Sequence, residues 1–212
     1  MLRHDIDRKP GHALRIAAIE KKFGIKATYY FRSIKSVFSP EIIREVAALG
    51  HEIGFHYESL SNANGNREKA IGEFGEDLKK FRNITDIKTI CMHGRPLSPH
   101  DNRDMWKYYD LKDFELLGEA YVSINEGLYY FSDTGRTWSL TNKIRDHMRN
   151  AKLVQVDTTD SLIEMIKTGE LDRIYILTHP ERWSTNNAEW AVDCCKDAVF
   201  NAGKRIISAV RP

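Results

Sequence analysis

Hydrophobic and polar residues follow one another in blocks, and these blocks predict strands that alternate with helices. Short apolar runs rich in β-branched and aromatic residues are typical of strands, whereas apolar residues that recur every three or four positions are typical of helices. The predicted strands are residues 2–7, 26–31, 51–56, 86–93, 119–123, 129–132, 153–156 and 173–178, with a further terminal strand at 205–210. The predicted helices are residues 10–23, 40–49, 67–81, 141–150, 159–167 and 187–202.

Residues that favour helix ends support these boundaries. Pro10 suits the first turn of a helix, and Gly24 suits its end. Ser39 followed by Pro40 predicts a second helix start, and Gly50 stops that helix.

The alternation of strands and helices predicts right-handed βαβ units and a mostly parallel sheet. Seven or so repeats favour a barrel over an open sheet. We therefore expect an α/β fold, namely a distorted or incomplete (β/α) barrel of about seven parallel strands. With 212 residues and no linker, residues 1–212 are expected to form a single domain. Because the first residues already have the character of a core strand, the domain either begins abruptly or lacks an upstream segment.

The composition argues against several classes of partner and adds no evidence for a particular function. Hydrophobic residues make up 42% and charged residues 29% of the chain, and the net charge is +2 without a basic block. These values give no electrostatic case for nucleic acid or an anionic membrane as a partner. The sequence shows no membrane span, signal peptide or glycine-rich nucleotide loop. The vicinal pair Cys194 and Cys195 favours buried thiols, and a reducing, cytoplasmic location is expected.

Residues with metal-binding and acid–base chemistry recur where the predicted strands end. Asp5 and Asp7 end the first strand, and residues two apart on a strand share one face. His56, His93 and His179 end three further strands. In a parallel barrel those ends lie on one rim, where catalytic groups converge. An Asp with two neutral imidazoles and an open position is ordinary catalytic zinc ligation.

Several segments resemble the motifs of the polysaccharide deacetylase (NodB-homology) superfamily, which comprises metal-dependent carbohydrate esterases. The similarity covers about residues 2–183, in the family's order. The similar segments are Arg3-His4-Asp5-Ile6-Asp7, Ala27-Thr28-Tyr29-Tyr30-Phe31, Gly50-His51-Glu52-Ile53-Gly54-Phe55-His56, Arg95-Pro96, Asp133-Thr134-Gly135-Arg136-Thr137-Trp138 and Thr178-His179-Pro180. The segment ending at His56 is specific, whereas the match at 133–138 is loose.

The resemblance implies a role for each matched residue. Asp5 corresponds to the general base, Asp7 and His56 to metal ligands, and His179 to the catalytic acid. Arg95 corresponds to the arginine that orients the base, although Arg3 could also hold it. The implied cofactor is a divalent metal, most simply Zn²⁺, and the implied partner is a carbohydrate substrate.

One departure from the family's pattern leaves the third metal ligand open. The family usually places a second histidine four residues after the first, and here that position holds Leu60. His93 is the preferred replacement, because its strand end should neighbour that of His56 and because imidazole is a favoured ligand. Glu58 is the alternative. His51 is expected to point to the other face of its strand.

Three aromatic residues are candidates for substrate binding, since aromatic faces stack on sugar rings. They are Tyr30, Trp138 and Trp183, of which Trp183 suits a core position equally well. His4 and His12 are expected to be flanking or surface groups.

The expected function is removal of an N-acetyl group from an amino sugar of a polysaccharide or its precursor. Two alternatives stay open: hydrolysis of another non-peptide C–N bond on the same fold, or a catalytically silent carbohydrate-binding homologue, for which Leu60 is the best argument. The sequence does not indicate an oligomeric state.

Overall fold

The computed structural model describes residues 1–95, 97–124, 127–139, 145–148, 150–152, 154–184 and 186–210, with residues 204–210 described by their backbone only. Among these residues, seven parallel strands form one sheet in the order β5-β4-β3-β2-β1-β7-β6. The strands are β1 (Leu2–Ile6), β2 (Thr28–Arg32), β3 (Glu52–Tyr57), β4 (Thr89–Met92), β5 (Gly118–Glu119), β6 (Tyr129–Ser132) and β7 (Ile174–Thr178). The sheet is a curled half-barrel, as the alternation of elements predicts.

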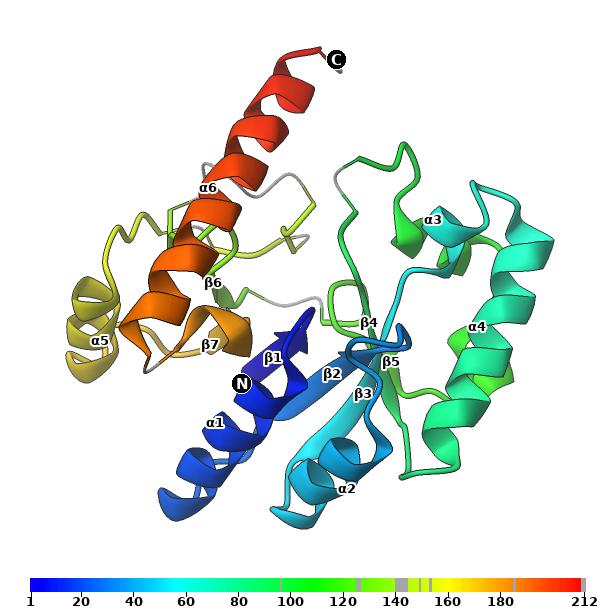
Figure 1. Cartoon of the computed structure of the whole chain (residues 1–212), viewed down its shortest axis with the longest axis horizontal. Coiled ribbons are helices and arrows are strands. Elements are labelled where there is room, and N and C mark those ends of the chain that lie inside the picture. Colours follow the sequence, from blue (N-terminus) through cyan, green and yellow to red (C-terminus); the bar gives the residue numbers. More distant parts are fainter. Residues whose placement is uncertain are drawn as a thin grey trace.

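The helices follow the strands along the chain. They are α1 (Pro10–Lys22), α2 (Pro40–Ala48), the short α3 (Ser59–Asn62), α4 (Arg67–Arg82), α5 (Thr159–Lys167) and α6 (Asn187–Val210), with 3₁₀ turns at Asn102–Lys107, Leu111–Phe114 and Pro180–Arg182. Figure 1 shows α1, α2 and α4 outside the sheet and α6 extending well past it. None of the helices in the described ranges is long and apolar enough to cross a membrane.

Local sequence explains the helix ends. The Ser39 hydroxyl accepts a hydrogen bond from the Ile42 N–H at the start of α2, with Pro40 in the first turn. Gly24 ends the α1 region with a φ of +69°, a left-handed conformation that glycine adopts without strain. These two helix boundaries are therefore the ones that the sequence predicts.

The core lies between the sheet and its helices and is aromatic on the α4 side. The rings of Phe55, Phe74 and Phe81 are buried, and Phe55 lies 5.4 Å and 5.0 Å from the other two between centroids. A smaller cluster holds Phe131, Trp138, Val156 and Leu162 beneath α5. The first cluster fixes β3 against α4 and thereby sets the position of the residues that follow β3.

Several predicted elements differ from the structure. Residues 205–210 continue α6 as helix and do not form a strand. The strand expected at 119–123 is reduced to Gly118–Glu119, and residues 154–156 form no strand, although Lys152 bridges to Tyr129. Residues 145–148 are not helical, and the rest of the helix expected at 141–150 lies partly outside the described residues, as does Leu153.

The cysteines also differ from expectation. Cys91 is buried, but Cys194 is only half-buried and Cys195 is exposed. Both lie on α6, whose outer face is open to solvent, so an apolar spacing of alanines was not enough to predict burial.

Candidate active site

The carboxyl ends of the parallel strands bring most of the predicted site residues together. Asp7 follows β1, His56 lies on β3, His93 follows β4 and His179 follows β7. One carboxylate oxygen of Asp7, Oδ1, lies 3.3 Å from His56 Nε2 and 3.5 Å from His93 Nε2. Its other oxygen lies 3.9 Å from His179 Nε2. Four segments that are distant in sequence thus meet around one carboxylate.

The outer nitrogens of the two imidazoles are held by hydrogen bonds, which leaves both Nε2 atoms facing Asp7. His56 Nδ1 bonds to the Cys91 carbonyl oxygen at 2.9 Å, and His93 Nδ1 bonds to Glu58 Oε2 at 3.2 Å. Such partners fix the ring orientation and tautomer of metal-binding histidines. Asp7 Oδ1 is buried and makes no hydrogen bond of good geometry within the described part of the chain. One carboxylate and two imidazoles, donor types that Zn²⁺ takes in proteins, therefore lie side by side.

The structure separates the two candidates for the third ligand by position. His93 faces Asp7, whereas the Glu58 carboxylate lies behind His93 and pairs with Arg32 Nη2 at 2.5 Å. Burial opposes the ionised form of Glu58, but the hydrogen bond with His93 and the Arg32 charge outweigh it and lower its pKa to about 2. Leu60, where the family has histidine, is buried in α3 among apolar side chains.

Electrostatics couple Asp7 to the imidazoles. Burial alone would raise the pKa of Asp7, but the neighbouring histidines hold it well below its usual value. Burial likewise opposes protonation of His93, yet the close Asp7 carboxylate and the hydrogen bond to Glu58 raise the pKa of His93 to about 9. The ionised Asp7 and the protonated His93 therefore stabilise each other.

Asp5 is held by Arg3, not by Arg95. Arg3 and Asp5 lie two residues apart on β1 and point to the same face, with Nε to Oδ1 at 3.0 Å and Nη2 to Oδ2 at 3.1 Å. The expected contact from Arg95 does not form, because its side chain is bound elsewhere: Nη1 donates to Asn62 Oδ1 at 2.5 Å, and Nε lies 3.7 Å from Glu58. Pro96, next to it, lies outside the described residues.

His179 is paired with the aspartate of the loosely matched fourth segment. His179 Nδ1 donates to Asp133 Oδ1 at 2.6 Å, and the Asp133 Oδ2 atom accepts from the Trp183 Nε1–H at 2.8 Å. Burial and the nearby Arg182 charge disfavour protonation, but the Asp133 charge and hydrogen bond raise the pKa of His179 above its usual value. The pairing leaves Nε2 directed at Asp7, ready to hold a proton there.

Two buried groups at the site were missed by the sequence reasoning. The Glu181 carboxyl is almost fully buried, and neither oxygen has a hydrogen bond among the residues that the structure describes. Burial, followed by the Asp7 charge, raises the pKa of Glu181 to about 7. Cys91 Sγ lies 3.7 Å from Asp5 Oδ2, and Asp5, His56 and Cys91 offer possible metal-ligand atoms within 4.8 Å of one another. The only indication in the sequence was position: Cys91 lies on β4, just before His93, and Glu181 lies two residues after His179.

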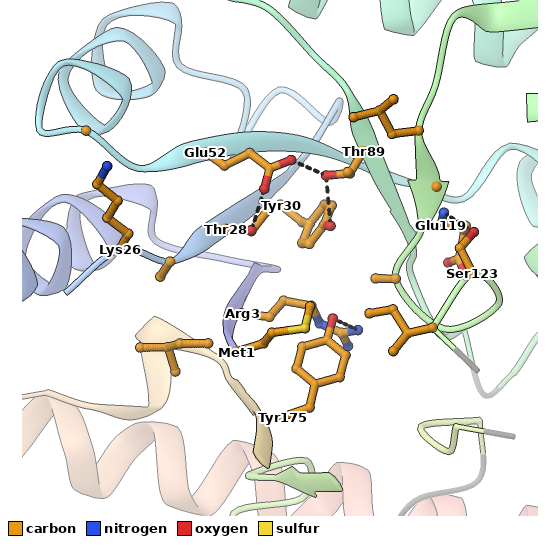
Figure 2. A pocket seen from close by; sticks show the side chains of 17 residues that line it. Met1, Arg3, Lys26, Thr28, Tyr30, Glu52, Thr89, Glu119, Ser123 and Tyr175 are labelled. Atoms are coloured by element: carbon orange, nitrogen blue, oxygen red, sulfur yellow. Dashed lines mark hydrogen bonds between the residues drawn. The ribbon is translucent and has the colours of Figure 1, made fainter. Parts of the chain in front are cut away.

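The aromatic candidates occupy three different environments. Tyr30 is buried and donates to Thr89 Oγ1 at 2.9 Å in a 580 Å³ cavity that is lined mainly by residues at strand starts (Figure 2). Asp7 follows the end of β1, at the opposite edge of the sheet. The position of Tyr30 contradicts a role in binding the same substrate. Trp138 is buried and donates to Thr159, whereas Trp183 is 43% exposed beside His179.

Two other histidines, His4 and His51, lie on the face of the sheet that α1 covers. His4 Nε2 bonds to Glu20 at 2.8 Å, and His51 Nε2 to the Ala17 carbonyl at 3.1 Å. His51 thus faces away from the site, as its spacing predicts. His4, which contacts Glu20 of α1, and His12, which lies on α1 and contacts Glu189 of α6 at 3.2 Å, are both buried and not surface groups.

Comparison with solved structures finds this fold in carbohydrate deacetylases. A variant of the peptidoglycan deacetylase PdaC from Bacillus subtilis is 13% identical, with a TM-score of 0.51 over 99% of this chain and 91% of that one. A family 4 carbohydrate esterase from Streptomyces lividans, in complex with acetate, is 13% identical, with a TM-score of 0.48 over 96% of this chain and 87% of that one.

A CE4 family pseudoenzyme from Bacillus anthracis is also similar, with 13% identity and a TM-score of 0.48 over 96% of this chain. The chain spans 60% of the length of that pseudoenzyme. No family model and no curated protein matches the sequence. The likeness to PdaC shows that this chain has the NodB-type polysaccharide deacetylase fold.

Proposed function

We propose that the protein is a metal-dependent hydrolase that removes an N-acetyl group from an amino sugar of a polysaccharide or glycan precursor. The observation that carries this proposal is the convergence of Asp7, His56 and His93 beside the Arg3-bound Asp5 and the Asp133-bound His179. The fold shared with a peptidoglycan deacetylase supports it. Location in the cytoplasm stays a prediction.

The donor atoms beside Asp7 are of the types that a divalent ion takes. Asp7 Oδ1 and the two Nε2 atoms form a set of one carboxylate and two imidazoles, each imidazole held from behind. These residues would hold the ion, and Zn²⁺ is the proposed species because it favours this donor set. When bound, such an ion supplies Lewis-acid activation of water and of the acyl oxygen.

The remaining residues account for the proton transfers. Asp5 accepts a proton from the attacking water, and Arg3 keeps its carboxylate oriented. His179 delivers a proton to the leaving amine of the sugar, while Asp133 holds its Nδ1–H and stabilises the imidazolium. The products are acetate and a free amino sugar.

A second candidate function is that of a silent carbohydrate-binding homologue. The observation that favours it is Leu60, a buried apolar residue where the family carries a metal ligand. Metal analysis separates the two, because the enzyme should hold about one ion per chain and the silent homologue need hold none.

The direct test is acetate release from N-acetylated glycans, with and without chelator. We expect release that the chelator abolishes and that Asp5→Asn lowers by at least about 100-fold, since general base catalysis contributes that much. Asp86→Asn is the matched control, because Asp86 is an exposed carboxylate at the far end of β4. Absence of release from every glycan, or full activity in Asp5→Asn, would contradict the proposal.

A further inference from the structure

Asp146 carries a buried carboxylate that the proposed mechanism does not use. It lies in the described segment 145–148, between β6 and α5 in the sequence. We propose that Asp146 is a positioning residue, which acts through Tyr121 and Arg3 to hold the Asp5 carboxylate in the orientation of a general base. This inference rests on the proposed function and adds to it a residue that acts only through others.

A chain of hydrogen bonds joins Asp146 to Asp5. The Tyr121 hydroxyl donates to Asp146 Oδ1 at 2.9 Å, and Arg3 Nη2 donates to the Tyr121 hydroxyl oxygen at 2.7 Å. The same nitrogen, Arg3 Nη2, donates to Asp5 Oδ2 at 3.1 Å. Arg3 Nε is paired with Asp5 Oδ1 by charge, but neither atom has a hydrogen bond of good geometry in the described part of the chain. The nitrogen that orients the base is therefore also the one that Tyr121 fixes.

Asp146 sets the direction of these hydrogen bonds. A tyrosine hydroxyl has a single proton, and the Tyr121 proton goes to Asp146, so a lone pair of the hydroxyl oxygen faces Arg3. Burial opposes ionisation of Asp146, but the hydrogen bonds that it accepts from Ser132 and Tyr130 lower its pKa to about 2. Asp146 is thus a permanent acceptor, and without it nothing would keep the Tyr121 proton turned away from Arg3.

The Asp146 carboxylate also joins the two edges of the half-barrel. β5 and β6 are the outermost strands of the sheet and lie apart (Figure 1). Tyr121 follows β5, whereas Tyr130 and Ser132 lie on β6. Tyr130 donates to Asp146 Oδ1 at 2.5 Å, and Ser132 donates to Asp146 Oδ2. Because β6 is connected to β1 through β7, Asp146 holds Tyr121 at a fixed place relative to Arg3.

Substitution of Tyr121 tests the link through kinetics. Tyr121→Phe removes the hydroxyl and keeps the ring, whose centroid lies 4.3 Å from Arg3 Cζ. We expect kcat for acetate release to fall about 10-fold while KM and zinc affinity stay within about twofold, because a misplaced base slows the reaction without weakening binding. An unchanged kcat in Tyr121→Phe would overturn the proposal.

Tyr29→Phe is the matched control. The Tyr29 hydroxyl is also buried and donates to a carboxylate, Glu20 Oε2, at 2.6 Å, but it faces α1. We expect Tyr29→Phe to lose stability in thermal unfolding, as Tyr121→Phe does, and to keep its kcat. An equal loss of kcat in both variants would mean that the effect is merely structural, and it would also overturn the proposal.

Variants of Asp146 test whether it acts through Tyr121. Asp146→Ala should lower kcat as Tyr121→Phe does, and it should cause no further loss in the Tyr121→Phe protein, since the two residues act as one unit. Asp146→Asn keeps a carbonyl oxygen that accepts from Tyr121 and should retain most of kcat. Separate, additive losses in the double variant would contradict the link. If Asp146→Ala does not fold, the comparison of Tyr121→Phe with Tyr29→Phe decides.

Nuclear magnetic resonance of the Arg3 guanidinium measures the same link without catalysis. The Nη signals of an arginine are resolved only while rotation about its Nε–Cζ bond is slow. We expect resolved Arg3 signals in the parent and in Tyr29→Phe, and signals broadened by rotation in Tyr121→Phe.

The two proposals fail in different ways. If no glycan releases acetate but the Arg3 signals differ as expected, the proposed hydrolysis is wrong and Asp146 still holds the Asp5 carboxylate through Tyr121. If acetate is released and Tyr121→Phe changes neither kcat nor the Arg3 signals, the positioning role is wrong and the hydrolase stands.

Discussion

At the end of β1, one oxygen of Asp7 lies close to the imidazoles of His56 and His93. Whether His93 or Glu58 is the third metal ligand decides which substitution abolishes zinc binding. His93 faces this oxygen at 3.5 Å, and Glu58 lies behind His93. We expect His93→Ala to lose zinc binding. Glu58→Gln should retain it with about 10- to 100-fold weaker affinity, the usual cost of removing an outer partner of a metal-binding histidine.

Zinc titration by calorimetry, with metal content per chain as a second measurement, checks this order. Glu52→Gln serves as a control, because the Glu52 carboxylate bonds to Thr28 and Thr89 at the opposite end of the sheet. Loss of zinc in Glu58→Gln together with full binding in His93→Ala would reverse the assignment.

Glu181 makes the stability of the metal-free protein depend on pH. Its pKa is raised to about 7 in the folded protein, against about 4.3 for an ordinary glutamate. Between these values folding takes up a proton, so the free energy of unfolding should fall as pH rises from about 4.5 to 7 and stay lower above that.

Glu181→Gln cannot ionise and should therefore be more stable than the parent at pH 8, by roughly 1–3 kcal/mol, and equal to it near pH 5. Urea unfolding at both pH values, with chelator present, measures the difference. Glu164→Gln, at an exposed carboxylate, is the control. A variant less stable than the parent at pH 8 would mean that the buried carboxylate is held by partners other than those described.

The sequence predicted those site residues that lie at strand ends and follow the order of the family's motifs. Asp7, His56 and His179 come together because parallel strands end on one edge. Arg3 and Glu181 were harder, because choosing Arg3 over Arg95 as the partner of Asp5 depends on side-chain directions that motif spacing does not give. Nothing in the sequence around Glu181 indicates that both carboxylate oxygens are buried.

Among the elements, β3 depends on a close approach that only glycine allows. A Cβ on Gly54 would lie 2.2 Å from Tyr30 Cε1 and 3.0 Å from the Thr89 carbonyl oxygen. Tyr30 is buried and paired through Thr89, so it has little room to move. We expect Gly54→Ala to destabilise the protein by about 3 kcal/mol through overpacking.

Gly72→Ala is the matched control, because a Cβ there meets nothing within 4 Å among the described residues and the position is inside α4. It should stabilise by about 0.5–1 kcal/mol, the difference in helix propensity. Thermal and denaturant unfolding of both variants measure whether the free energy of unfolding falls in Gly54→Ala and rises in Gly72→Ala. If Gly54→Ala unfolds like the parent, Tyr30 is not held in the position described.

The elements that sequence patterns predicted well are those whose own residues determine them. Helix α4 begins and ends within one residue of the expected range, since its apolar stripe and the Asn66 cap are local. The terminal strand expected at 205–210 is instead the end of α6. Short apolar runs such as Ile206–Ile207 suit either structure, and the choice depends on whether a sheet edge is available.

For the molecule as a whole, the proposed metal should contribute to stability as well as to chemistry. Asp7, His56 and His93 belong to β1, β3 and β4 or follow them, and these strands are distant in sequence, so an ion that binds all three would favour only the folded chain. At free zinc 100 times above the dissociation constant, the gain is about 2.7 kcal/mol. We expect zinc to raise the melting temperature and a chelator to reverse the rise.

Asp7→Asn should abolish this response while leaving the fold intact, and differential scanning calorimetry measures it. Asp157→Asn is a suitable comparison, because that carboxylate is exposed just before α5 and does not lie beside the imidazoles. A melting temperature that zinc does not change in the parent protein would argue against an ion shared by these three segments.

The pairing of Arg3 with Asp5 has a consequence for how freely the surrounding loops can change. Both residues belong to one central strand, and two tyrosine hydroxyls, from Tyr121 and Tyr175, approach the same guanidinium from inside the half-barrel. The orientation of the Asp5 carboxylate is thus fixed by contacts inside the half-barrel and does not depend on the turn that contains Arg95. Exchanging that turn for one of another length should alter which glycans are accepted, whereas Asp5 should still accept a proton as the general base.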